Sequence, residues 1–236
     1  MALRIFDTDP EEMIRRQQQA RRRTWTEYAF EFRSGRVVNR RPVSLSTWRV
    51  LTGDPGVADA VAQLMGGTPE EWDPAKEMHL EVVTEQQSVE VIIDGPEVID
   101  ERLILWGRTG PVHECDGEFY LSPAEDKGRP CGCPRLLRER KEAARAGRGP
   151  SPSITVPFRL AHDPELGLGR YVAHAWSFAE HLHELKQALL EVGEPALCHL
   201  RIEQVEYTTP AGETRRFRKP VVDVLGSYNT AIAEDR

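Results

Sequence analysis

The sequence lacks any long apolar run. Its 236 residues contain no stretch of membrane-spanning length, and residues 1–16 hold no apolar core of the kind found in signal peptides. We therefore expect a cytoplasmic protein without a membrane partner, in a compartment where thiols are kept reduced. Disulfide bonds are not expected there, so any clustering of cysteines needs another explanation.

Recognisable catalytic motifs are also missing. The sequence has no HExxH zinc-protease motif, no phosphate-binding loop, no dinucleotide-binding fingerprint and no Ser/His/Asp motif context. His181 and His183 are two residues apart in a predicted helix, so they point to different faces and cannot easily share one metal ion. The sequence predicts no catalytic residue, and a non-enzymatic protein is favoured over an enzyme.

Net positive charge is absent from the chain as a whole. The formal charge is −7 and the pI about 5.6, which argues against nucleic-acid binding by bulk electrostatics. Three local exceptions exist: a predicted helix over residues 10–23 with five arginines, residues 135–148 with a net charge of +4, and the basic residues of 215–219. Such runs are more often solvated faces, although they can also contact phosphates or an acidic partner.

Cysteine is scarce, and its few copies are clustered. Three of the four cysteines lie within residues 115–133, where Cys131-Gly132-Cys133 forms one close pair and His113-Glu114-Cys115 offers another. Structural zinc takes four nitrogen or sulfur ligands, usually as two short-range pairs separated by a loop. The loop between these pairs is rich in proline, glycine and charge, so a metal would replace a hydrophobic core. The pattern predicts a structural zinc ion held by Cys115, Cys131, Cys133 and His113.

Other interpretations of this cluster stay open at the level of sequence. His174, His199 and Cys198 are rival fourth ligands, and the cysteines could instead be partly buried free thiols or a redox pair. A catalytic zinc would need an open coordination position and a neighbouring general base. Glu114 and Asp116 are adjacent, but an acidic residue beside a cysteine is common on a surface turn.

Hydrophobic periodicity predicts an α+β protein. In the first half, Tyr28, Phe30 and Phe32 alternate as in a half-buried strand that turns at Ser34-Gly35. A strand in "STWRVLTG" follows, then a helix that begins at Asp54-Pro55 and ends at Gly66-Gly67. Its apolar face comprises Val57, Val61, Leu64 and Met65. "MHLEVVTEQQSVEVIIDG" then reads as a hairpin, and "LILW" as a buried strand.

The second half repeats the same succession of elements. A helix in "PRLLRERKEAARAGRG" and a linker, "GPSPS", precede strands in "ITVPFRLA" and "GRYVAHAW". A helix with a Ser177/Glu180 capping box then runs to about Val192 and stops at Gly193. Two final strands are joined by a Pro-Ala-Gly-Glu turn. Each half thus reads as strand, helix and hairpin.

This succession predicts two strand–helix–hairpin units with an inserted zinc-binding segment. The units could form a pseudo-repeat, or two ordinary segments could simply look alike. The expected segments are a basic N-terminal helix or arm at 1–25, a first α+β unit at 26–110, the zinc-binding segment and basic helix at 111–150, and a second α+β unit at 151–236.

The order of motifs along the chain resembles a known family. "FRSGRVVNRRPVSLSTWRVLTGDPGVADAVAQLMGGTPEEWD", "CDG" at 115–117, "PCGCP" at 130–134 and "FRLAHDPELGLGRYVAHAWSFA" resemble recombination directionality factors of actinobacterial temperate phages. These are accessory proteins of large serine integrases, and the resemblance is to the larger, zinc-containing type. It covers roughly residues 33–226, and the basic helix at 10–23 has no place in it.

The resemblance implies a non-enzymatic switch in the bacterial host cytoplasm. Such a factor binds the coiled-coil region of a serine integrase on attachment-site DNA, with little or no sequence-specific DNA binding of its own. It turns the integrase from integration (attP × attB) to excision (attL × attR). The alternatives are a zinc-stabilised phage replication or single-stranded-DNA accessory protein and, with less support, a metal-dependent hydrolase.

Overall fold

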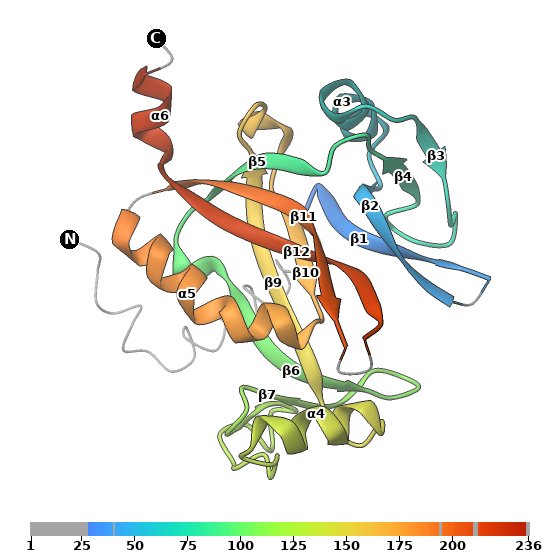
Figure 1. Ribbon diagram of the computed structural model, residues 1–236, viewed down its shortest axis with the longest axis vertical. Helices are drawn as coiled ribbons and strands as arrows, with labels where there is room; N and C mark the ends of the chain where they lie inside the picture. The colour runs from blue at the N-terminus through green and yellow to red at the C-terminus, as the bar shows by residue number, and fades with distance from the viewer. Residues whose placement is uncertain (1–27, 40, 194, 210–211, 235–236) are drawn as a thin grey trace.

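The structure, a computed structural model, describes residues 28–39, 41–193, 195–209 and 212–234. Within these ranges the chain is α+β: twelve strands form one large mixed sheet and four α-helices accompany it (Figure 1). The predicted fold class is confirmed at this level. The predicted basic arm at 1–25, with its helix over 10–23, lies outside the described residues.

The strands and helices have the following bounds. The strands are β1 (Phe30–Val38), β2 (Arg41–Thr52), β3 (Pro69–Glu71), β4 (Leu80–Val83), β5 (Ser88–Ile93), β6 (Asp100–Trp106), β7 (Pro111–Cys115), β8 (Tyr120–Ser122), β9 (Ser151–Leu160), β10 (Gly169–Ala173), β11 (Ala196–Thr208) and β12 (Thr214–Ser227). The α-helices are α3 (Pro55–Met65), α4 (Leu137–Arg145), α5 (Trp176–Val192) and α6 (Tyr228–Glu234). Two short 3₁₀ helices are η1 (Pro96–Val98) and η2 (Pro164–Leu166).

Strand β1 joins the two halves of the sheet. It pairs in parallel with β10 and antiparallel with β2, in the order β12-β11-β5-β9-β10-β1-β2-β4-β3. A branch leaves this path where β6 pairs with β9, and it continues through β7 to β8. That branch, together with α4, forms a separate lobe at one end of the molecule (Figure 1).

The segment from β4 to β5 curls the sheet towards closure. β4 pairs with β2, whereas β5 pairs with β9 and β11. The backbone N–H of Trp48 donates to Gln86 (3.1 Å) and that of Ile202 to Gln87 (2.8 Å), so the intervening residues tie β2 to β11. The predicted hairpin over residues 78–95 is therefore wrong: the polar Glu85–Gln87 centre is a bend between two strands that have different partners.

Aromatic side chains fill the space that the curled sheet encloses. Alternation along β1 turns Phe30 and Phe32 inward, both fully buried, as the sequence predicts. Phe32 lies edge-on to Phe158 with ring centroids 5.2 Å apart, and Trp48 packs against both Phe32 and Tyr171. Burying one such side chain contributes roughly 1.5–3 kcal/mol. These aromatic side chains form the centre of the hydrophobic core.

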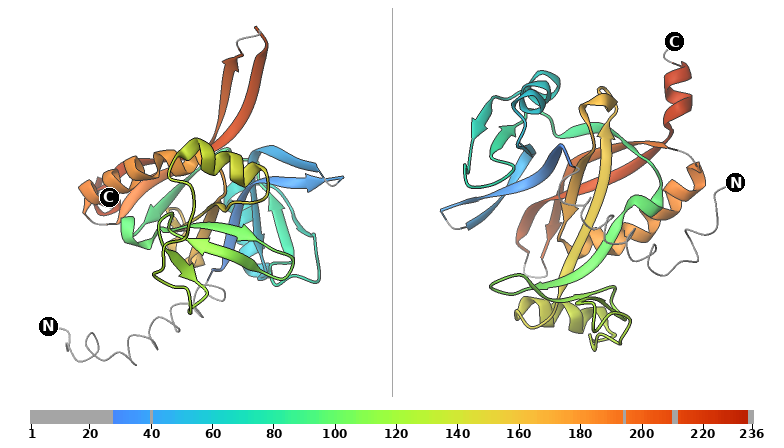
Figure 2. Two further views of the ribbon diagram at one scale, coloured as in Figure 1. Left: turned by 90° about the horizontal axis from the view of Figure 1, so that it is seen from below. Right: turned by 180° about the vertical axis from the view of Figure 1, so that it is seen from behind.

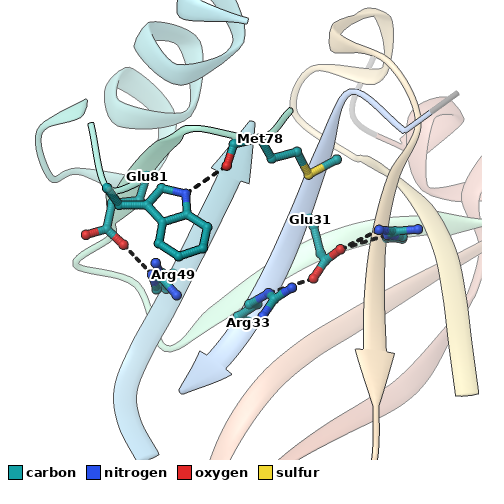
Figure 3. A network of polar contacts seen from close by, with 7 residues as sticks. Glu31, Arg33, Arg49, Met78 and Glu81 are labelled. Carbon is teal, nitrogen blue, oxygen red and sulfur yellow. Dashed lines mark hydrogen bonds and ion pairs between the residues drawn. The ribbon is translucent and has the colours of Figure 1, made fainter. Parts of the chain in front are cut away.

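The opposite face of β1 and β2 carries paired charges (Figure 3). The Glu31 carboxylate, only 5% exposed, accepts hydrogen bonds from Arg33 (2.6 Å) and from Arg170 of β10 (2.6 and 2.9 Å). Arg49 of β2 pairs with Glu81 of β4. A buried charge is tolerated only when it is paired, so these contacts fix the relative positions of four neighbouring strands.

Helix α3 begins and ends as predicted. The Asp54 side chain accepts a hydrogen bond from the Gly56 N–H (2.7 Å), Pro55 occupies the first turn, and Gly66 closes the helix with φ 75°. Its buried residues are Val57, Ala58, Val61 and Met65. Leu64, predicted to share that face, is instead 41% exposed.

Helix α5 has the predicted extent but not the predicted start. Its N-cap is Ala175, which makes no side-chain capping bond, so the expected Ser177/Glu180 capping box is wrong. The helix ends at Val192, and Gly193 adopts the left-handed conformation (φ 69°) that favours glycine at this position. Its buried residues are Leu182, Leu185 and Leu189.

Two predicted breaks in the chain are strands in the structure. Residues 34–35 continue β1 through an irregularity between Arg33 and Gly35. A Cβ at Gly35 would lie 2.9 Å from the Val43 carbonyl oxygen, so the glycine serves close strand approach rather than a turn. The predicted linker at 149–153 is also wrong, because residues 151–153 pair with β6 as the start of β9.

The pseudo-repeat is not confirmed. β11 and β12 form the predicted hairpin, but β4 and β5, their proposed counterparts, do not pair with each other. Strands of the two proposed units also interleave, since β9 pairs with β5 and β6, and β10 with β1. The segment boundaries at 26–110, 111–150 and 151–236 stay a prediction. Among the described helices, none combines the length and apolar character that a membrane crossing demands.

Candidate metal centre

Two of the four predicted metal ligands lie on strand β7. His113 and Cys115 are two residues apart, so their side chains leave the strand on the same side. Glu114 leaves on the other side, where it pairs with Arg102 of β6. Because of this alternation, the Glu114 carboxylate points away from the side chains of His113 and Cys115. Glu114 instead anchors β7 to β6.

The other two ligands lie in the loop between β8 and α4. Gly132 separates Cys131 from Cys133 and adopts φ 70°, a left-handed conformation that glycine accepts without strain. The Cys131 N–H donates to the Glu118 carbonyl (2.8 Å), which attaches this loop to the turn between β7 and β8. The tight Cys-Gly-Cys turn thereby faces the side chains from β7.

The four side chains converge on one point. The ligand atoms of His113, Cys115, Cys131 and Cys133 all lie within 4.8 Å of one another. The Cys115 and Cys133 sulfurs are 3.9 Å apart, and the Cys133 sulfur is 3.4 Å from His113 Nε2. Zinc bond lengths of about 2.3 Å to sulfur and 2.0–2.1 Å to nitrogen give tetrahedral edges of roughly 3.8 and 3.5 Å. The observed separations fit a tetrahedral ion.

The charged forms of the thiols in the cluster depend on a bound cation. Burial raises the pKa of the Cys115 thiol, and the neighbouring cysteines raise it further. Burial also raises the pKa of the Cys133 thiol and lowers the pKa of the His113 imidazole. Thiolates packed this closely repel one another, so their charged forms require a metal ion, which would displace the thiol protons and bind the neutral imidazole.

Groups around the ligands also support the anionic form. The Gly117 N–H hydrogen-bonds the Cys115 sulfur, which opposes the effect of burial on the Cys115 pKa. Arg140 of α4 donates to the Gly117 carbonyl (2.7 Å), and its charge lowers the pKa of Cys133. Three thiolates around one divalent cation leave a net charge of −1, and the Arg140 guanidinium offsets it. Such outer contacts orient ligands and tune affinity.

Asp116 shapes the turn that follows Cys115. Its carboxylate accepts hydrogen bonds from the backbone N–H groups of Glu118 (2.8 Å) and Phe119 (2.7 Å), and these bonds lower the pKa of Asp116. Gly117 completes the turn with φ 107°. In the "CDG" motif, then, the aspartate and the glycine position a ligand, and the carboxylate is engaged with backbone amides.

The lobe has almost no other core. None of residues 118–130 is buried, and α4 contains no buried residue. Cys115 and Cys131, by contrast, are 0% and 5% exposed. A metal ion bound at the cluster would hold together a segment that buries its cysteines and little else. Four protein ligands would also complete a tetrahedral site, leaving no open position for water or substrate.

The rival fourth ligands lie elsewhere. Cys198 is fully buried in the main core on β11, His199 approaches Glu90 (3.3 Å), and the His174 ring contacts the Pro152 carbonyl (3.1 Å). Within the described part of the chain, His113 is the histidine that joins the three cysteines. All four cysteines are free thiols in the structure.

Sequence reasoning missed the outer contacts of the site. Arg140 was counted only as one member of the basic run at 135–148, although it reaches Gly117 across 23 residues. The "CDG" motif gave no indication of which helix would cover the turn that it forms. Tyr120, whose ring lies 4.7 Å from the His113 ring, was missed as well.

The basic run at 215–219 is largely neutralised within its own hairpin. Arg215 pairs with Glu213 (3.2 Å), Arg216 with Glu206 (2.5 Å) and Lys219 with Glu203 (3.7 Å). These ion pairs therefore fit a solvated face better than a phosphate-binding patch. Tyr207 and Phe217 form an exposed aromatic pair on the same hairpin, with ring centroids 6.0 Å apart.

Comparison with known proteins gives no further assignment. No protein-family model matches the chain, and no solved structure matches it. The conclusion available from the chain itself is therefore the chemical one: residues 113–133 bring a histidine and three cysteines into a cluster positioned to bind a metal ion and compatible with zinc.

Proposed function

We propose that this protein is a recombination directionality factor that binds a large serine integrase and switches it from integration to excision. The observation that carries the proposal is the ordered set of sequence motifs described above, which runs from residue 33 to residue 226. The cluster of His113, Cys115, Cys131 and Cys133 is consistent with the zinc-containing type of that family.

The positions of the motifs in the fold support treating them as one unit. The first motif forms most of β1 together with β2, α3 and β3, and the last forms the end of β9, η2, β10 and the start of α5. The parallel pairing of β1 with β10 brings these two segments side by side. The cysteine motifs stabilise the lobe that branches from β9. The motifs together therefore cover parts of the sheet and of the lobe attached to it, and they include no recognisable catalytic motif.

We infer a structural role for zinc. The donor set of three thiolates and one imidazole is typical of structural zinc, and it fills the coordination sphere. A metal-dependent hydrolase requires a position for water or substrate, together with a base aimed at it. The neighbouring carboxylates do not meet that need, since Glu114 pairs with Arg102 and Asp116 accepts backbone amides. These contacts favour a binding protein.

The switch itself would operate through differential affinity. A serine integrase has a coiled-coil arm whose arrangement decides which pair of sites can synapse. A factor that bound all arrangements equally would shift nothing, so this protein must prefer the arrangement that permits attL × attR synapsis. The partner is the integrase on its attachment sites, and the protein contributes neither bond breakage nor strand joining.

The test uses purified protein, the integrase encoded by the same phage and the two pairs of sites. We expect excision product from attL × attR only when the protein is added, together with reduced integration from attP × attB. Zinc content and circular dichroism establish that the added protein is folded. Undiminished integration with no excision product from folded protein would overturn the proposal.

One observation favours a second candidate, a single-stranded-nucleic-acid accessory protein. Tyr207 and Phe217 are 47% and 44% exposed, and exposed aromatic side chains can stack on unpaired bases. Against this candidate, two of the cations beside the aromatic pair, Arg215 and Arg216, already have carboxylate partners on the same hairpin. Tight, salt-sensitive binding of an oligonucleotide in the absence of integrase, weakened by Tyr207→Ala, would favour this candidate over the directionality factor.

A further inference from the structure

The hairpin of β1 and β2 projects from the body of the molecule. Figures 1 and 2 show it extending beyond the sheet in a different direction from the β11–β12 hairpin. Every described residue from 36 to 44 is exposed, including Val37 at 72%, Val38 at 38% and Val43 at 43%. Four residues of extended strand reach roughly 13 Å at about 3.3 Å per residue. We call the described residues of this hairpin, 35–39 and 41–44, the β1–β2 arm.

The charge of this region is unlike that of the rest of the protein. Residues 32–53 contain five arginines and no aspartate or glutamate, in a chain whose net charge is −7. Where β1 and β2 enter the body, two of these arginines have carboxylate partners: Arg33 pairs with Glu31 of the same strand, and Arg49 pairs with Glu81 of β4 (Figure 3). Carboxylates are therefore supplied at the base of the hairpin.

The arm itself has no such neutralisation. Arg36 and Arg41 form no ion pair with any other described residue, and both are exposed. Cross-strand pairing of Arg36 with Val43 and of Val38 with Arg41 puts all four side chains on one face of the ribbon. That face thus presents two unpaired cations with apolar groups between them.

We infer that the β1–β2 arm contacts the sugar–phosphate backbone of double-stranded DNA in a sequence-independent manner. A two-stranded β-ribbon is one of the elements that the major groove admits, and the arm is longer than the groove depth of about 8.5 Å. Unpaired arginines on an uncovered ribbon match a polyanion better than they match the mixed charge of a typical protein surface. The contact needs no base recognition, so it adds affinity without choosing a site.

The β11–β12 hairpin supplies a matched control. Arg215 and Arg216 lie on a second exposed hairpin but are paired with Glu213 and Glu206. Replacing two arginines by glutamine on either hairpin changes the net charge of the protein equally. Any difference between the two double variants therefore reports the local contact and not bulk electrostatics.

The test is fluorescence anisotropy of a labelled duplex of arbitrary sequence, with full-length protein and no integrase, between 50 and 200 mM salt. Each lost phosphate contact makes the slope of log K against log salt less negative by about 0.9. We expect Arg36→Gln/Arg41→Gln to make the slope less negative by about 1.8. Arg215→Gln/Arg216→Gln should leave the slope within about 0.5 of the wild-type value. Circular dichroism and zinc content should be unchanged in both variants, because all four side chains are exposed.

Several outcomes would overturn the inference. These are no duplex binding at 50 mM salt, equal effects of the two double variants, or stronger binding of a single strand than of the duplex. Binding of poly-glutamate but not of DNA would assign the arm to an acidic protein partner instead. A change of oligomeric state in the arm variant, without any change in DNA binding, would assign it to self-association. None of these measurements uses integrase, so the recombination assay can fail or succeed independently.

Discussion

At the scale of single residues, the cysteines fall into two chemical environments. Cys115, Cys131 and Cys133 face one another and His113 across a lobe with little other buried material. Cys198 lies in the main core, surrounded by the apolar side chains of β11 and its neighbours. In the cluster, a bound cation would allow the three thiols to become thiolates. In the core, the apolar surroundings keep the Cys198 thiol uncharged. The two groups should therefore differ in metal binding and in reactivity.

Replacing a ligand should remove the metal. We expect one zinc ion per wild-type chain purified without added zinc, and near zero in Cys131→Ser, since three remaining ligands leave the ion open to solvent and chelators. His113→Cys should retain zinc better than His113→Ala because a fourth donor is restored. Elemental analysis gives the stoichiometry.

Cys198→Ala is the control for ligand loss, because it removes a thiol that lies outside the cluster and should keep one zinc per chain. A metal-free wild-type protein, with Cys131→Ser melting at the same temperature, would contradict a structural zinc site. Retention of zinc by His113→Ala would leave the three cysteines as ligands and exclude His113 as the fourth.

Thiol reactivity should separate the same two groups. Burial raises the pKa of Cys198 to about 12, above its ordinary value, so at pH 8 its thiol stays protonated and unreactive. We expect Ellman's reagent to react slowly with the zinc-bound protein. After chelation it should react with three thiols, because the lobe loses the metal that replaces its core and the burial that raises the pKa of Cys115 and Cys133 is lost with it. The fourth thiol should react only after denaturation. Reactivity of Cys198 in the folded protein should rise only as the pH approaches its raised pKa. Rapid modification of four thiols in the native protein at pH 8 would contradict this.

The clustering of His113 with three cysteines could be predicted from sequence, and the contacts that support the cluster could not. His113 and Cys115 form one short-range pair and Cys131 and Cys133 form another, all within 21 residues of a cysteine-poor chain. Two such pairs separated by a loop are the usual pattern of a structural zinc site. Arg140 reaches Gly117 only because α4 folds back over the turn. That return is a tertiary contact, which residue spacing does not encode.

At the scale of elements, the sequence predicted the ends of a helix correctly where residues next to that helix decide them. Asp54, Pro55 and Gly66 place the ends of α3 through contacts within a few residues. The predicted hairpin at 78–95 failed because strand pairing is decided by partners far away in sequence: β4 pairs with β2, and β5 with β9 and β11. A strand pattern indicates which face is buried, but it does not identify the neighbouring strand.

The parallel pairing of β1 with β10 should be the most sensitive junction between elements. Gly169 pairs with Phe30, and a Cβ at Gly169 would lie 2.0 Å from the Phe30 ring. We expect Gly169→Ala to destabilise the protein by about 1–3 kcal/mol, because the ring has no empty space to enter. Urea unfolding followed by tryptophan fluorescence measures this loss.

A double-mutant cycle identifies the cause of that loss. Phe30→Leu alone should destabilise the protein through lost packing, but it also removes the ring atoms that collide with the new methyl group. Gly169→Ala should therefore cost less in the Phe30→Leu background than in the wild type. Equal costs in the two backgrounds would show that the glycine is needed for a reason other than the ring.

At the scale of the whole molecule, charge and structure are distributed unevenly. The chain carries a net charge of −7 and its body encloses an aromatic core, while the lobe with the His/Cys cluster and two hairpins extend from that body (Figure 2). One hairpin pairs Arg215, Arg216 and Lys219 with its own carboxylates, and the other leaves Arg36 and Arg41 unpaired among the described residues. This arrangement suits a protein that works by contacting several partners at once, as a factor acting on an integrase–DNA complex would.

The last prediction concerns how metal loss affects the proposed switch. If one preference for an arrangement of the integrase arm produces both activation of attL × attR and inhibition of attP × attB, the two effects must appear over the same protein concentration range. Cys131→Ser should then lose both effects together, because the lobe loses the metal that replaces its core, whereas Cys198→Ala should retain both. Titration of each variant into both reactions, with circular dichroism and zinc content measured on the same samples, makes the comparison. Loss of one effect with the other intact in Cys131→Ser would mean that the two activities use separate surfaces, and that a single biased equilibrium is not the mechanism.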